Sequence, residues 1–230
     1  MSPEPYTTPV AAMVSRFTVV RYADGQPDSG KAGLRSLADA IDEAHRPVAK
    51  LVDRLERTDG ELPATGVAAA ITIGGFTPVL WLEAAYLPPP PDTPGRFTPP
   101  YREVLDRGGS YTVTYTDSDQ PEGGLDREVL LPSVAFAVEV AFDRLGLWFA
   151  GLRGSGARAG HPWQVTATVG LHEHTVARLL CRYQPPPLDL VPTTDPAFRT
   201  ALTLAPDTRP PRNGDEQPAP AVSLDKETPR

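Results

Sequence analysis

Two stretches of the sequence, VLWLEAAYLPPP at residues 79–90 and VARLLCRYQPPP at residues 176–187, follow one pattern 97 residues apart. In each stretch apolar residues recur at every second position up to a tyrosine, and three prolines follow soon after it. This alternation predicts a β-strand with one face toward a core, and proline cannot continue the hydrogen bonding of a strand. The match therefore predicts two equivalent strands that each end a repeating unit.

The match between the two parts of the chain extends backwards from these strands. FTV at 17–19 and QPDSG at 26–30 are matched 94 residues later by YTV and QPEGG, and ITIG at 71–74 is matched by ATVG 96 residues later. Between these segments, apolar residues recur at helical spacing in both copies. The matched apolar positions are Leu34, Leu37, Ile41, Ala44, Val48, Leu51, Val52 and Leu55, and then Leu131, Val134, Val138, Ala141, Leu145, Trp148, Phe149 and Leu152.

The predicted fold is α+β, a tandem internal repeat of two strand–helix–strand–strand units at about 16–88 and 110–186. Six strands would form a mainly antiparallel sheet, with two long helices on one face. This arrangement resembles the tandem module of the GyrI-like effector-binding domains. The resemblance implies a cleft between the repeats that binds small molecules, often through an aromatic residue and a carboxylate. Because the likeness is one of topology, no site residue is transferred from that family.

The prolines mark the predicted boundaries of the domain, since 28 of the 230 residues are proline and most of them are clustered. We expect a flexible N-terminus at 1–15, a single pseudo-symmetric domain at 16–187 with a Pro-rich linker at 88–100, and a disordered tail at 188–230. Within the tail, the residues after Ala205 are the poorest in large apolar side chains.

The composition favours a cytoplasmic protein that has no membrane span and no cofactor. No apolar run reaches the roughly 20 residues of a membrane helix, the first residues lack the pattern of a signal peptide, and Cys181 is the only cysteine. The net charge of −7 argues against nucleic acid as a general partner. The excess of arginine over lysine is typical of a GC-rich bacterial genome.

The candidate site lies on the sheet face that the predicted helices leave open. Strand alternation places Val79, Trp81, Glu83 and Ala85 on this face, matched by Val176, Arg178, Leu180 and Arg182. We select Trp81, Glu83, Arg178 and Arg182 as ligand-binding candidates. The expected function is that of a non-catalytic binding module for a small molecule or a protein, with the ligand on the open face or at the seam between the repeats.

Two alternative functions follow from other features of the sequence. An accessory protein could dock a partner through its sheet or its Pro-rich tail, and a homodimer is compatible with the open face. A DNA-binding regulator would need a helix-turn-helix at 163–180, where GLHEHTVARLL resembles a recognition helix. The β-branched residues at 163–169 and the repeat register favour a β-hairpin there instead.

A zinc site and a catalytic site are the remaining possibilities. Three histidines and the cysteine lie within 21 residues: His161, His172, His174 and Cys181. A zinc site would need them to converge, but His172 and His174 fall on the expected hairpin turn. The pair Asp117 and Asp119 reads as a solvated turn. No nucleotide-binding loop or nucleophile motif is present, so we expect neither a metal nor an enzyme.

Overall fold

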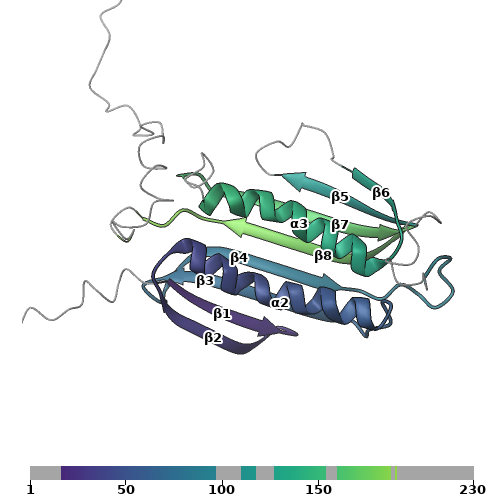
Figure 1. Cartoon of the computed structure of the whole chain (residues 1–230), viewed down its shortest axis with the longest axis horizontal. Coiled ribbons are helices and arrows are strands. Elements are labelled where there is room, and N and C mark those ends of the chain that lie inside the picture. Colours follow the sequence, from purple (N-terminus) through teal and green to yellow (C-terminus); the bar gives the residue numbers. More distant parts are fainter. Residues whose placement is uncertain (1–16, 97–109, 118–126, 154–159, 188–189, 191–230) are drawn as a thin grey trace, which may run out of the picture.

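One large antiparallel sheet carries two helices on one of its faces in the computed structural model (Figure 1). The structure describes residues 17–96, 110–117, 127–153, 160–187 and 190. Along the chain the elements are β1 (Phe17–Ala23), β2 (Gln26–Leu34), α2 (Leu37–Arg57), β3 (Thr65–Ile73), β4 (Thr77–Tyr86), β5 (Tyr111–Asp117), β6 (Arg127–Leu131), α3 (Val134–Arg153), β7 (Trp163–Leu171) and β8 (His174–Tyr183). The predicted α+β class is therefore confirmed.

The described part of the sheet has eight strands, so the prediction of six was wrong. Their order is β2-β1-β3-β4-β8-β7-β5-β6. The two strands missed are β2 and β6, which form the edges of the sheet and bury almost none of their residues. An edge strand that buries almost none of its side chains needs no apolar alternation, and this alternation is the signal on which the prediction relied. The predicted flexible N-terminus and, apart from Leu190, the predicted tail lie outside the described residues.

The two halves of the chain follow the same order of elements. Each contains two strands, a helix and two more strands, and the strand order is symmetric about the contact between β4 and β8. Each half has one strand more than the strand–helix–strand–strand unit on which the likeness to GyrI-like domains rested. Internal duplication stays a prediction, because the arrangement alone does not establish descent.

The contact between β4 and β8 is an antiparallel ladder of seven residue pairs, from Leu80 opposite Tyr183 to Tyr86 opposite Ala177. Glu83 and Leu180 form the central pair. Beyond each end of the ladder, the Leu87 backbone N–H donates to the Val176 carbonyl and the Gln184 N–H donates to the Val79 carbonyl, both at 2.8 Å. The halves are thus joined by continuous backbone hydrogen bonding.

Val79 and Val176 do not lie on the open face as predicted, since both are buried. Each is the extra residue of a β-bulge: Ile71 faces Leu80 while Thr72 faces Pro78, and the same shift surrounds Val176. A bulge inserts one residue into a strand and reverses the alternation beyond it. The prediction assumed an uninterrupted strand, and so it placed these two valines on the wrong face.

The segment that resembled a helix-turn-helix is a β-hairpin made of β7 and β8. His172 and Glu173 form its two-residue turn, and residues 174–183 are a strand where a recognition helix would have to lie. The helix-turn-helix interpretation was therefore wrong, and the hairpin prediction is confirmed. Three residues, 74–76, form the corresponding turn between β3 and β4, so the turn in the second half is one residue shorter.

Both helices begin at a serine that caps the first turn. The Ser36 hydroxyl accepts from the Asp39 backbone N–H at 3.1 Å, and the Ser133 hydroxyl accepts from the Phe136 N–H at 3.2 Å. Such caps satisfy backbone donors that the helix leaves without an internal partner. The helices begin later than predicted, because Leu34 and Leu131 lie at the ends of β2 and β6, opposite Phe17 and Tyr111.

Pro47 lies inside α2 without splitting the helix. Proline has no N–H, so the carbonyl of Glu43 loses its helical donor. Arg21, which projects from β1, takes over this role: its Nε donates to the Glu43 carbonyl at 3.4 Å, and its Nη2 pairs with the Glu43 carboxylate. The Glu43 carbonyl that Pro47 leaves free is therefore a point at which Arg21 of β1 joins the sheet to α2.

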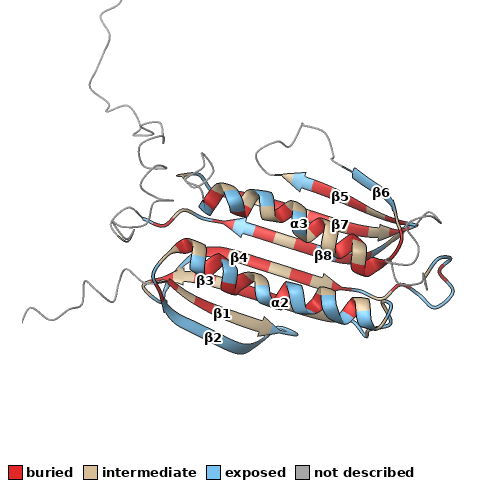
Figure 2. Cartoon of the chain, viewed as in Figure 1, coloured by how far each residue is buried: buried red, intermediate tan, exposed pale blue. Residues whose placement is uncertain are grey.

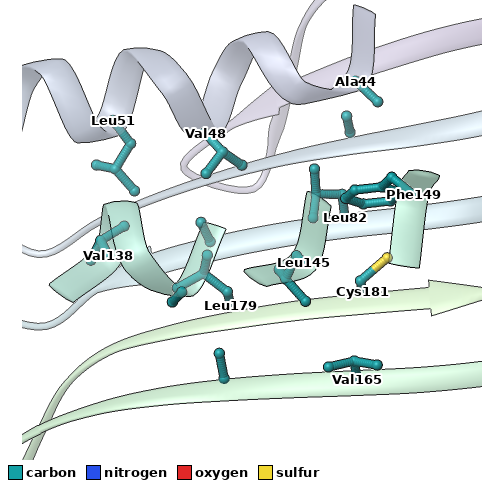
Figure 3. Packing of buried hydrophobic residues seen from close by; sticks show 14 of the residues in the cluster. Ala44, Val48, Leu51, Leu82, Val138, Leu145, Phe149, Val165, Leu179 and Cys181 are labelled. Carbon is teal, nitrogen blue, oxygen red and sulfur yellow. The ribbon is translucent and has the colours of Figure 1, made fainter. Parts of the chain in front are cut away.

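The core lies between the helices and the sheet, and both halves contribute to it (Figure 2). Figure 3 shows Leu51 of α2 facing Val138 of α3, and Leu145 of α3 close to Leu179 of β8. Trp148 is only partly buried, although its sequence match Leu51 is 1% exposed. Phe149, the next residue, is buried in the core instead.

His45 occupies the contact between the two helices. Its ring packs edge-on against Phe142 and Phe149, with centroid distances of 5.1 and 4.3 Å, and its Nε2 is buried without a hydrogen-bond partner among the described residues. Burial, and then the nearby Arg153 charge, lower the pKa of His45 from 6.5 to about 4, while Asp42 acts in the opposite direction. The neutral imidazole is therefore the form that the folded protein accommodates.

Truncation of Leu51 tests whether the halves share one core. We expect Leu51→Ala to lower the free energy of unfolding by about 2–5 kcal/mol, because the side chain contributes to a closely packed interior. Leu147→Ala is the matched control: Leu147 is 63% exposed on α3, and its loss should change stability by less than about 0.5 kcal/mol. Urea unfolding followed by circular dichroism and by tryptophan fluorescence should give one coincident transition. Two separate transitions, with Leu51→Ala shifting only one, would contradict a shared core.

The pH dependence of stability tests the position of His45. Since its pKa is lower in the folded state than in the unfolded state, the unfolded chain binds more protons between these values. The stabilising effect is complete above pH 6.5 and is lost as the pH falls toward 4. His45→Gln cannot titrate in this window, so the difference in stability between the parent and the variant should narrow as the pH falls. A difference that stays constant from pH 7 to pH 4 would place His45 in contact with solvent.

Candidate functional site

A cavity of about 340 Å³ opens on the sheet face opposite the helices. We call it the aromatic pocket, and its lining residues are Tyr22, Gly25, Gly66, Val67, Ala68, Trp81 and Glu83. All of them belong to β1, β3, β4 or the turn after β1, so the first half of the chain alone forms the pocket. Two of the four candidates selected from the sequence, Trp81 and Glu83, lie in it together.

Two aromatic rings and one carboxylate give the aromatic pocket its chemical character. The rings of Tyr22 and Trp81 have centroids 5.4 Å apart and are tilted by 53°. The Trp81 Nε1–H donates to Glu83 Oε2 at 3.2 Å. This hydrogen bond fixes the indole beside the carboxylate, and the carboxylate retains further acceptor positions for a ligand.

Strand register explains why these three side chains meet. Trp81 and Glu83 are two residues apart on β4 and therefore project on the same side. Ala68 of β3 lies opposite both Glu83 of β4 and Tyr22 of β1. Trp81 of β4 lies opposite Ala70 of β3, so the short side chains of Ala68 and Ala70 leave room for the rings of Tyr22 and Trp81 to approach each other across β3.

The turn after β1 closes one end of the aromatic pocket. Asp24 and Gly25 both have positive φ angles, 49° and 79°, which is the pattern of a tight two-residue hairpin turn. The Asp24 Oδ1 accepts from the Gly66 N–H at 2.9 Å and from the Thr65 hydroxyl at 3.1 Å. These hydrogen bonds, the one from Gly66 first, hold the pKa of Asp24 below its ordinary value. The turn is thus tied to the start of β3.

The other two candidates, Arg178 and Arg182, lie on the same sheet face but do not line the aromatic pocket. Arg182 is opposite Trp81 in the ladder, yet its Nε donates to Gln164 Oε1 on β7 at 3.2 Å. Arg178 is opposite Ala85 and is exposed. Both arginines are therefore neighbours of the pocket and not part of its lining.

Tyr22 is the residue of the aromatic pocket that the candidate list lacked. The alternation of β1 placed it on the open face, but nothing in the sequence shows that β1 and β4 lie on either side of β3. β2 and β3 follow each other along the chain but are not neighbours in the sheet, so the positions of β1 and β4 beside β3 become clear only from the order of the whole sheet. The Asp24–Gly25 pair was the one local signal for the hairpin that closes the pocket.

The residues considered for zinc are spread over different environments. Cys181 is buried in the core, where burial raises the pKa of its thiol well above the ordinary value. His172 lies at the β7–β8 turn, with Nε2 3.1 Å from the Pro94 carbonyl, and His174 lies 3.9 Å from Glu173. Across residues 17–96, 110–117, 127–153, 160–187 and 190, no three histidine, cysteine or acidic side chains gather in an arrangement that could hold a metal ion.

Comparisons of the chain with protein-family models, with curated proteins and with solved structures found no match. Neither of the two described helices is long and apolar enough to cross a membrane.

Proposed function

We propose that this protein is a non-catalytic binding module that takes a small organic cation in the aromatic pocket. The observation that carries the proposal is the convergence of two tilted aromatic rings and a carboxylate on one cavity in the open sheet face. The volume of about 340 Å³ falls at the lower end of the range of small-molecule sites.

A positively charged ligand fits this arrangement for two reasons. Aromatic faces attract cations through their quadrupole, and two rings at 5.4 Å can contact one ammonium group from two sides. Among the described residues, no arginine or lysine lies within ion-pairing distance of Glu83, so its charge is available to a ligand. A neutral apolar molecule would gain contact with the rings but would displace water from the carboxylate without replacing its hydrogen bonds.

The aromatic and acidic residues of the pocket are not repeated at the matching positions of the second half, and this supports a single site. At the spacing that relates β4 to β8, Arg178 corresponds to Trp81 and Leu180 corresponds to Glu83. In the first strands Thr116 corresponds to Tyr22. We infer that the halves descend from an internal duplication, after which the first half acquired or kept the ligand-binding residues.

A protein partner on the open sheet face is the competing function. A partner of that kind would contact the threonines of β5 and β7 and the exposed arginines of β8 as well as the first half. The presence of a cavity lined by two aromatic rings and one carboxylate favours the small ligand. The two functions differ in which residues matter: the aromatic pocket alone, or the whole face.

Choline and its neutral isostere 3,3-dimethylbutan-1-ol test the proposal directly. We expect calorimetric titration to show binding of choline and at least about tenfold weaker binding of the alcohol, because only the positive charge of choline is attracted by the ring faces and by the carboxylate. Glu83→Gln should weaken choline binding about tenfold or more while leaving the unfolding temperature within a few degrees of the parent. Arg178→Ala, on the same face but outside the pocket, is the matched control and should retain the affinity of the parent.

Three outcomes would contradict the organic-cation proposal. They are equal affinity for choline and the alcohol, an unchanged affinity in Glu83→Gln, and no binding of either probe at millimolar concentration. A loss of binding in Arg178→Ala equal to that in Glu83→Gln would instead indicate recognition by the whole sheet face.

A further inference from the structure

A second cavity, of about 170 Å³, lies on the helix side of the sheet, where α2 passes the end of β1 and the edge strand β2. We call it the basic groove. Four of its lining residues are cationic: Arg21, Arg46, Lys50 and Arg54. The last three are spaced four residues apart on α2 and therefore form one row along the helix, and Arg21 approaches from β1.

Arg21 is held in place at the base of the groove by Glu43. The Glu43 side chain is 5% exposed and pairs with Arg21, with Lys31 at 2.5 Å and with Arg46 at 3.1 Å. These interactions, with the Lys31 hydrogen bond first, hold the pKa of Glu43 below its ordinary value, so the carboxylate stays charged. One buried negative charge thus faces three positive charges.

The outer part of the groove adds positive charge that no described carboxylate neutralises by direct contact. Within the described residues neither Lys50 nor Arg54 has an ion-pair partner, and both are exposed. The acidic lining residue is Asp28, whose Oδ2 accepts from the Ser29 hydroxyl at 3.4 Å. Asp24 lies close enough for Arg54 to lower its pKa, though only as the weakest of its causes. Cations therefore outnumber carboxylates in and around the groove, in a chain whose net charge is −7.

We propose that the basic groove binds the phosphate group of a small ligand. Guanidinium and ammonium groups that converge on one cavity are the donors that recognise phosphate oxygens. Pro47 and Leu51 supply an apolar part of the lining, so an apolar or planar body next to the phosphate has a surface to contact. The cavity volume admits a phosphate monoester of modest size and not a folded polymer.

The basic groove is a separate site from the aromatic pocket, although Tyr22 and Val67 line both cavities. Neither Trp81 nor Glu83 lines the groove, and none of its four cations lines the pocket. The two sites differ in the sign of the charge that they prefer, so each can be tested with a probe that the other repels.

Phenyl phosphate and inorganic phosphate are the probes for the basic groove. We expect titration calorimetry at low ionic strength to show binding of both, with phenyl phosphate tighter because its ring contacts the apolar lining. The double substitution Lys50→Gln and Arg54→Gln should weaken binding of phenyl phosphate about tenfold or more, a loss of about 1.4 kcal/mol or more, because it removes two charged donors to the phosphate. These positions are exposed, so the unfolding temperature should stay close to that of the parent.

Arg57→Gln is the matched control, because Arg57 is exposed on the same helix, pairs with Asp53 at 3.7 Å and does not line the groove. Arg57→Gln should leave the affinity for phenyl phosphate within about twofold of the parent. Trp81→Ala, which removes a ring of the aromatic pocket, should do the same. Equal losses in the double variant and in Arg57→Gln would overturn the proposal, because they would reduce it to a general effect of charge. Failure of both probes to bind would also overturn the proposal. Binding of heparin without binding of phenyl phosphate would overturn it too, because the surface would then recognise a polyanion and not a small phosphate ester.

Discussion

The pairing of β4 with β8 is the interaction on which the rest of this structure depends. Seven residue pairs and two flanking backbone hydrogen bonds join the halves into one sheet, with Glu83 and Leu180 at the centre. Because the ladder is continuous, α2 and α3 lie side by side on the same face and bury Leu51, Leu145 and Phe149 in one core (Figure 3). The same alternation that turns Leu82 and Ala84 toward the helices turns Trp81 and Glu83 to the open face. The alternation along β4 therefore determines both which residues enter the core and which residues form the candidate site.

Apolar periodicity predicted the elements that bury a face, and it failed for those that do not. The helices and the six inner strands all contact the core, so selection for burial leaves a pattern in their sequences. β2 contains Pro27, Gly30 and Gly33 and buries only Leu34, and nothing in it alternates. Pro27 is tolerated because β2 is an edge strand. The bulges at Val79 and Val176 escaped prediction for a related reason: a single inserted residue changes the face of a side chain without changing the composition around it.

The candidate sites differ in how far the sequence could reveal them. Trp81 and Glu83 share a strand, so alternation alone placed them together. Tyr22 joins them only because β1 and β4 flank β3, which is a property of the whole sheet. The basic groove depends on a longer chain of causes: Pro47 frees a carbonyl in α2, Arg21 binds it, and Glu43 holds the arginine beside the row that Lys50 and Arg54 extend. No local sequence pattern predicts such a contact between a strand and a helix. The first half of the chain thus combines a cavity lined by two aromatic rings and a carboxylate with a second cavity lined by four cationic side chains.

Native-state hydrogen exchange at the β4–β8 ladder tests the central claim most directly. If this ladder holds the two halves in one cooperative structure, its amide protons, including that of Leu87 bonded to Val176, exchange only through global unfolding. Their free energy of exchange should then equal the free energy of unfolding from urea titration and should fall in parallel with it as urea is added. If these amides exchange at a clearly lower free energy, while those between β3 and β4 remain protected, the halves separate without unfolding. That result would contradict the account of a single sheet with a shared core.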